Sequence, residues 1–248
     1  MADATDGVPV EGSAEYLQDL VLTSPDVEQF LHELAVYSAD QLSDPKRRIY
    51  CGITLVRRKK SVTIASSDEN ARDLDEQQTR FGDGPCLTAI RTEQSTLVPE
   101  VDTEHRWPDY IEAAHEHGVR SILGVPFALD GEAGAGLNLY AGSAHAFSGE
   151  AIDRAENYVA TASKALNLSL RMAHLTDARD NLKAAMESRT TIDMAVGVIM
   201  AQNGCSQDAA FEVLRNASSA RNVKLREVAA AVVARLNEGR AIETRFDE

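Results

Sequence analysis

The chain of 248 residues has no proline after Pro126 and no glycine between Gly149 and Gly197. Proline and glycine are the residues that most often interrupt a helix, so nothing in this stretch breaks one. We therefore expect a continuous helix from about Ala151 to Gln202. Two ordinary helices that meet near Thr176 to Asp180 are the alternative.

Cysteine is scarce as well, and long apolar runs are missing. The three cysteines, Cys51, Cys86 and Cys205, are an odd number without C-x-x-C spacing, which argues against a disulfide framework or a zinc site. The first 20 residues are acidic, where a signal peptide would need a basic start and an apolar block. A P-loop, a G-x-G-x-x-G loop and a Ser–His–Asp order are also absent. We expect a cytoplasmic protein without membrane contact, structural metal, cofactor or enzymatic activity.

Acidic residues dominate the composition, and the net charge is −14. The imbalance is confined to the first part, because residues 1–176 contain 15 Lys and Arg against 28 Asp and Glu, whereas residues 177–240 contain 9 against 8. A near-neutral C-terminal part can bind nucleic acid if its arginines converge on one face, since affinity follows the local phosphate contacts.

Leucines recur every seven residues in the expected helix, at Leu168, Leu175 and Leu182. Apolar residues continue this register at Ala178, Ala185, Ile192, Val196 and Ile199. Such a seam is typical of a helix that packs on a partner helix. Arg189 interrupts it, so the last turns are expected to face something other than a twin helix. We predict a linking helix at residues 151–182 that forms a coiled coil and a homodimer.

Strand and helix patterns are mixed before the long helix. The patterns at Ile49 to Val56 and at Ser61 to Ala65 predict a hairpin around the basic turn Arg57 to Lys60, which we interpret as solvated. Because hairpins occur rather than regular βαβ repeats, an antiparallel α+β sheet flanked by helices is favoured. We expect a disordered acidic tail at residues 1–23 and a short tail at residues 241–248.

Four groups of residues in the first part of the chain form a recognisable pattern. They are Asp75, Gln78 and Gly82 to Cys86 with Ala89; Val98, Asp102, Trp107 and Pro108; Gly118 to Ile122 with Pro126; and Gly136 to Tyr140 with Phe147. Together they resemble the GAF domains of actinobacterial regulators. The resemblance implies a sensor domain, assigned to residues 24–150, with a central antiparallel sheet and a pocket on one face. That pocket is expected to take an unknown small ligand or to be vestigial, and its expected lining is Cys51, Phe81, Cys86, Leu123 and Leu139.

Cys86 allows a second interpretation of this domain's function. A GAF relative that reduces free methionine sulfoxide uses cysteine in a comparable glycine-rich turn, so the resemblance also allows a thiol reductase in which Cys51 would be the resolving thiol. Two small core cysteines are the alternative.

Two shorter helical patterns follow Asn203-Gly204, from Ser206 to Ala217 and from Leu225 to Asn237, and predict an all-α three-helix bundle on the end of the long helix. The distinctive residues of this region are Arg189 to Ala201, Ala209 to Phe211, Leu214-Arg215, Lys224-Leu225 and Val228-Ala229. They are similar to those of the ANTAR domain of transcription antitermination regulators. The similarity implies an RNA-binding domain at residues 183–240 that binds paired small hairpins in nascent transcripts, so that a terminator does not form.

The resemblance places the RNA surface on the face that holds Arg189, Ala195, Gly197, Arg215, Ser218, Arg221 and Lys224. Guanidinium groups can stack on unpaired bases or bind phosphate, and small residues let a base approach the backbone. The small residues can equally serve interhelix packing, and the charges can be solvated. The family often has lysine where this chain has Val196, which removes one phosphate contact.

A DNA-binding regulator is the remaining alternative for three helices with a basic edge. The absence of a clear base-reading helix rich in Arg, Asn and Gln counts against it.

The histidines of the first part do not suggest a metal site. His115 and His117 are two residues apart and would point away from each other on a helix, so we interpret them, with His105, as surface residues rather than metal ligands. Asp73, Asp75 and Glu76 are interpreted as a solvated helix face.

Overall fold

The computed structural model describes residues 13–45, 47–57 and 61–235. Its chain divides into two compact units, the first ending at Ala173 and the second beginning at His174. The helix α6 (Gly149–Asn203) contributes to both. It confirms the prediction of one uninterrupted helix and rules out two helices meeting near residue 178.

The first unit is built on a five-stranded antiparallel sheet with the strand order β2-β1-β5-β4-β3. The strands are β1 (Ile49–Arg57), β2 (Ser61–Ser66), β3 (Thr96–Val98), β4 (Ser121–Phe127) and β5 (Gly134–Ala141). The predicted hairpin is confirmed as β1 and β2, which pair from Gly52↔Ser66 to Arg57↔Ser61. Residues 58–60 of the basic turn lie outside the described residues.

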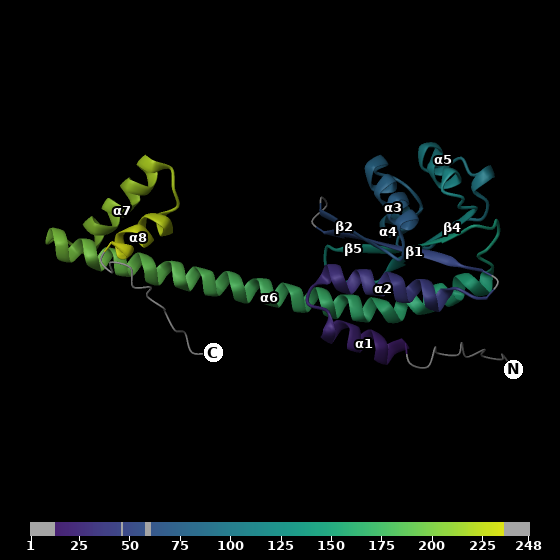
Figure 1. Cartoon of the computed structure of the whole chain (residues 1–248), viewed down its shortest axis with the longest axis horizontal. Coiled ribbons are helices and arrows are strands. Elements are labelled where there is room, and N and C mark those ends of the chain that lie inside the picture. The colour runs from purple at the N-terminus through teal and green to yellow at the C-terminus, as the bar shows by residue number, and fades with distance from the viewer. Residues whose placement is uncertain (1–12, 46, 58–60, 236–248) are drawn as a thin grey trace. The chain divides into compact units, whose positions relative to one another are not determined.

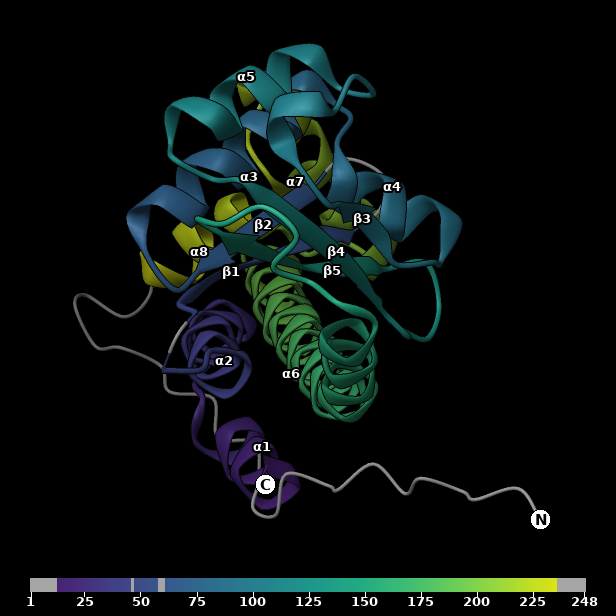
Figure 2. The same ribbon diagram turned by 90° about the vertical axis from the view of Figure 1, so that its right-hand side faces the viewer.

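Helices cover both faces of this sheet (Figures 1 and 2). The helix α2 (Val27–Leu42) and the first part of α6 cover one face, and α3 (Glu69–Phe81), α4 (Pro85–Thr92) and α5 (Pro108–Glu116) cover the other. A short 3-10 turn, η1 (Val101–Thr103), precedes α5. Side chains alternate along each strand, so Cys51, Ile53 and Leu55 of β1 lie in the core beneath α2 and α6. Their neighbours Gly52 and Thr54 face α3 and α4 instead.

The prediction of a disordered tail at residues 1–23 is wrong for its second half. Ser13–Thr23 forms the helix α1, and Leu17, Leu20 and Val21 are buried in the same core as α2. These three residues share one face of a helix at spacings of three and four, which supplies the apolar stripe that docks it. Residues 1–12 and 241–248 lie outside the described residues.

The second unit is a three-helix bundle of the last turns of α6 with α7 (Gln207–Arg221) and α8 (Leu225–Ala234). Ser206 caps α7 by accepting a hydrogen bond from the Ala209 amide, as its position after Gly204 predicts. Val196 and Ile199 of α6 are buried against Ala210, Leu214 and Val228. The last turns of α6 therefore face this bundle, as the interruption of the leucine seam indicates.

Candidate functional sites

A cluster of buried polar side chains lies between α3 and the sheet. Asp75 of α3 is fully buried, and its Oδ1 accepts hydrogen bonds from the Asn138 amide and, at 2.6 Å, from the Tyr140 hydroxyl. The Tyr110 hydroxyl donates to that of Tyr140 at 3.2 Å. The cluster thus joins α3 and α5 to β5.

The local sequence explains this placement. Ala71, Leu74, Asp75 and Gln78 are the buried residues of α3 and share one helical face. On β5, Asn138 and Tyr140 alternate with the apolar residues of the opposite face. A Cβ added at Gly52 would overlap the Asp75 carboxylate, so only glycine at this position lets the acid lie against the strand.

Burial raises the pKa of Asp75 to about 7, although the hydrogen bonds from Tyr140 and Asn138 lower it in part. Burial also raises the pKa values of Tyr110 and Tyr140 well above the ordinary range. Asp75 Oδ2, Asn138 Oδ1 and Gln78 Nε2 make no hydrogen bond with the described protein atoms. The site therefore holds a carboxyl group that can change its charge near neutral pH inside a buried layer.

Asp75 corrects the interpretation of a solvated acidic face, which holds for Asp73 and Glu76 alone. Sequence reasoning missed the buried cluster. The spacing of Asp75 from Ala71, Leu74 and Gln78 was the available signal, because it places the acid on the apolar side of the helix.

The residues expected to line one ligand pocket are not brought together. Cys51, Leu123 and Leu139 are buried on the face beneath α2 and α6. Cys86 lies on the other face, where a Cβ at Gly136 would meet its sulfur. Phe81 is 45% exposed at the end of α3. Strand alternation is the physical reason, since neighbouring strands present one set of side chains to each face.

Cys51 and Cys86 also fail to form a reactive pair. Both thiols are free and buried, and they lie on opposite faces of the sheet. Burial raises the pKa of each thiol well above its ordinary value, which disfavours the nucleophilic thiolate. This arrangement supports the reading of two core cysteines over that of a reductase with a resolving thiol.

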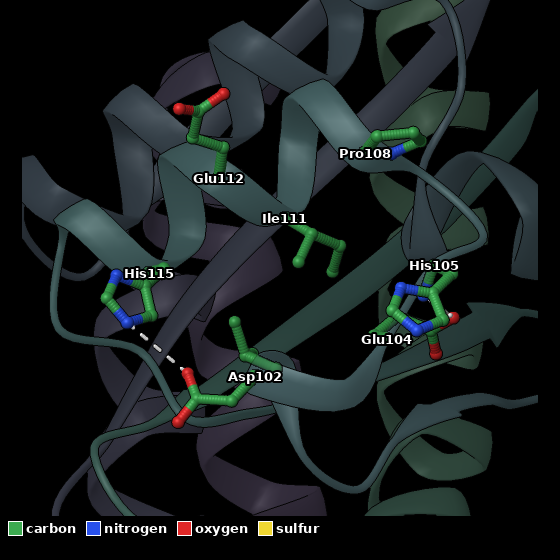
Figure 3. A pocket seen from close by; sticks show the side chains of 8 residues that line it. Asp102, Glu104, His105, Pro108, Ile111, Glu112 and His115 are labelled. Carbon is green, nitrogen blue, oxygen red and sulfur yellow. Dashed lines mark hydrogen bonds and ion pairs between the residues drawn. The ribbon is translucent and has the colours of Figure 1, made fainter.

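An open hollow of about 510 Å³ lies on the surface of the first unit between η1 and α5 (Figure 3). His115 points toward Asp102, with its Nε2 at 3.3 Å from the carboxylate. His117 instead lies 3.7 Å from Asp73, so the two histidines have different partners as their spacing predicts. Among the residues that the structure describes, no cluster of His, Cys, Asp or Glu could hold a metal ion.

Four exposed cations on α7, on the first turn of α8 and at the turn between them form what we call the basic corner. We use this name for Arg215, Arg221, Lys224 and Arg226, which are all exposed and have no acidic residue between them in the sequence. The turn is fixed by Asn222, which adopts a left-handed conformation, and by Ser218, whose hydroxyl donates to the Val223 carbonyl at 2.6 Å. Ser218 thus shapes the corner, while the cations project from it.

The other residues expected on the RNA face divide into two groups. Arg189 and Gly197 are exposed on α6, and nothing lies within 4 Å of a Cβ placed at Gly197. Ala195 is fully buried in the bundle core, so its expected place on the RNA surface is wrong and the packing alternative holds. Val196, where the family often has lysine, is buried as well.

The expected dimer seam is exposed. Leu168, Leu175 and Leu182 are 45%, 68% and 63% exposed, and Met172 and Met186 are exposed on the same helix. Met172 and Met186 continue the spacing of three and four residues along the leucines. The sequence pattern instead predicts Ala178 and Ala185 as the apolar residues that accompany the leucines. Arg179 occupies the position between Leu175 and Leu182 in this stripe.

A family model of the GAF domain matches residues 26–167, and a model of the ANTAR domain matches residues 180–233. The chain is a GAF–ANTAR protein. The predicted order of a GAF domain, a long helix and an ANTAR domain is confirmed, and the family boundaries differ from the predicted 24–150 and 183–240. This architecture supports an RNA-binding regulator with a sensor domain rather than an enzyme.

Solved structures that resemble the GAF–ANTAR chain share little sequence with it. The LuxR family transcription factor CepR2 from Burkholderia cenocepacia, which depends on N-acylhomoserine lactone, is 16% identical over 65% of this chain and 96% of its own, with a TM-score of 0.49. Free methionine-R-sulfoxide reductase from Neisseria meningitidis is 18% identical over 66% and 89%, with a TM-score of 0.45. The GAF domain of an Acinetobacter phosphoenolpyruvate-protein phosphotransferase is 16% identical over 66% and 94%, with a TM-score of 0.46.

No curated protein matches the chain. Within the described ranges, none of the helices combines the length and apolar character that a membrane span requires.

Proposed function

We propose that the GAF–ANTAR chain is a cytoplasmic transcription antitermination regulator whose ANTAR domain binds paired small hairpins in nascent RNA. The basic corner is the observation that carries this proposal. RNA affinity depends on local phosphate contacts, so a corner with four exposed cations can bind RNA although the whole chain is acidic.

The first test is binding of the full chain to an RNA with two short stem-loops, at two salt concentrations and with duplex DNA as competitor. Replacing both Arg215 and Lys224 by alanine should weaken binding about 10-fold or more and reduce its dependence on salt, because each lost phosphate contact removes part of the counterion release. The matched control replaces Arg72 and Arg80, two exposed arginines of α3, and should leave binding unchanged. Preference for duplex DNA, or equal binding by both double variants, would contradict the proposal.

We further propose that α6 pairs with its counterpart in a second copy through the exposed stripe of Leu168, Met172, Leu175, Leu182 and Met186. Exposed apolar side chains at this spacing are stabilised when two helices bury them against each other. A dimer would hold two ANTAR domains together, which suits an RNA with two hairpins.

Sedimentation of the full chain tests this pairing. Leu175→Asp should shift the protein from dimer to monomer over the measured concentrations, because it places a charge in the stripe. Ala184→Asp adds the same charge on the opposite side of α6 and should leave the dimer intact. A wild-type chain that stays monomeric with and without RNA would remove the basis of the pairing.

The GAF domain would supply the regulatory input by binding an unknown small ligand. The fold supports a sensor domain at this end of the chain, and the buried cluster around Asp75 is where a change in charge would reach α3, α5 and the sheet together. A ligand that alters the pairing of α6 would alter the spacing of the two ANTAR domains.

A further inference from the structure

Phe211 of α7 is a large apolar side chain at the surface of the ANTAR domain. It is 39% exposed, whereas Ala210 and Leu214 on the same helix are buried and Ala217 is partly buried in the bundle core. Phe211 lies beside this buried face and leaves much of its ring in contact with solvent. Single exposed apolar residues are common on protein surfaces, so the residues beside the ring decide what it can bind.

The neighbours of Phe211 along the helix surface are polar and lead to the basic corner. Arg215 and Ser218 follow Phe211 at spacings of four and seven, and therefore lie on the same side of α7. Arg215 pairs with Glu212 at 2.7 Å, but both side chains are exposed, so the pair is weak and its guanidinium group is free to take another partner. The aromatic face and a cation are thus presented together.

We infer that Phe211 is a platform on which an unpaired base of a bound RNA stacks, while Arg215 contacts the adjoining phosphate. This inference rests on the proposed RNA binding and adds a residue to which no RNA contact was assigned. Single-stranded loops are recognised in this way, through bases that stack on aromatic side chains beside positive charge.

The charge on the C-terminal side of Phe211 favours RNA over a protein partner, and Asp208 and Glu212 are the acids within one turn of the ring. From Arg215 to Arg226 the sequence carries four cations and no acid, which complements a phosphate backbone. The other large exposed apolar residue of α7, Val213, lies two positions from Phe211 and so points to the other side of the helix. It offers a control of similar exposure away from the basic corner.

The experiment combines protein variants with changes in the RNA. The probe is the RNA with two stem-loops and adenine in the loops, together with copies in which each loop adenine is replaced by an abasic residue. Phe211→Ala should bind the intact RNA about 10-fold more weakly than wild type, because stacking on one base is lost. Phe211→Leu, which keeps an apolar side chain without an aromatic face, should show the same loss, and Phe211→Trp should keep the affinity. Val213→Ala should bind like wild type.

A base that stacks on Phe211 is identified by a thermodynamic cycle. One abasic copy should bind wild type about 10-fold more weakly and bind Phe211→Ala with no further loss, since the partner of that base is already absent. Circular dichroism of each variant checks that the helices are formed. If Phe211→Ala and Phe211→Leu bind like wild type while the double variant of Arg215 and Lys224 is weakened, the platform is excluded and RNA binding stands. If wild type binds no RNA, both proposals fall.

Discussion

The two domains place their chemically distinctive residues in opposite locations. In the GAF domain an acid, an amide and two tyrosine hydroxyls are buried between the sheet and its covering helices. In the ANTAR domain the core is apolar and small, while the cations and one aromatic ring lie at the surface. The first domain thus carries its polar chemistry inside, and the second exposes its charges to a polar partner.

The largest effect expected from this difference between the domains is the pH dependence of stability that Asp75 causes. Its pKa is raised from an ordinary value of 3.8 to about 7, a shift of about three units that corresponds to about 4 kcal/mol. The unfolded chain releases this proton at lower pH than the folded chain. The contribution to stability is therefore fully present below about pH 4 and is lost as the pH rises through about 7.

Asp75→Asn removes this titration and keeps the shape of the side chain. Its unfolding free energy should lack the decline of about 4 kcal/mol that Asp75 causes between acid and neutral pH. Urea unfolding followed by fluorescence of Trp107, which is buried near the cluster, measures this at a series of pH values. Asp73→Asn, on the exposed side of α3, is the control and should follow wild type. An unchanged pH dependence in Asp75→Asn would show that the buried acid does not titrate there.

The next effect concerns the small core of the ANTAR domain. Leu214→Ala should destabilise that domain by about 3 kcal/mol, because the leucine is almost fully buried and its truncation leaves a cavity. Thermal unfolding followed by far-UV circular dichroism should show an early loss of helix, and RNA binding should weaken. The Trp107 transition of the GAF domain should be unaffected, and Val213→Ala should cost little. A simultaneous shift of both transitions would show that the two domains unfold together.

The smallest of the three effects concerns Gly52. Gly52→Ala should destabilise the GAF domain by about 2 kcal/mol, because the added methyl group must displace the Asp75 carboxylate from its hydrogen bonds. Gly149→Ala, at the start of α6 where nothing lies within 4 Å of the new methyl group, should be neutral. The same urea titration distinguishes the two. A fully stable Gly52→Ala would mean that the carboxylate can move away without loss.

Features that depend on local patterns can be predicted from the sequence. The lack of proline and glycine predicted α6 within a few residues of its observed bounds of Gly149 and Asn203, and alternating residues predicted the β1–β2 hairpin. The interruption at Arg189 indicated that the last turns of α6 face another body, and Val196 and Ile199 do so. These features follow from period and from turn residues, which act over a few positions.

Long-range packing sets which face each side chain joins, and the sequence pattern does not reveal it. This packing separated Cys51 from Cys86, buried Asp75 beneath α3, placed Ala195 in the bundle core and left Phe211 exposed. Each outcome depends on which elements cover which face, and residues far apart in the chain fix that choice. A local pattern defines the two sides of a helix or strand, but the partner that covers each side is set by long-range packing.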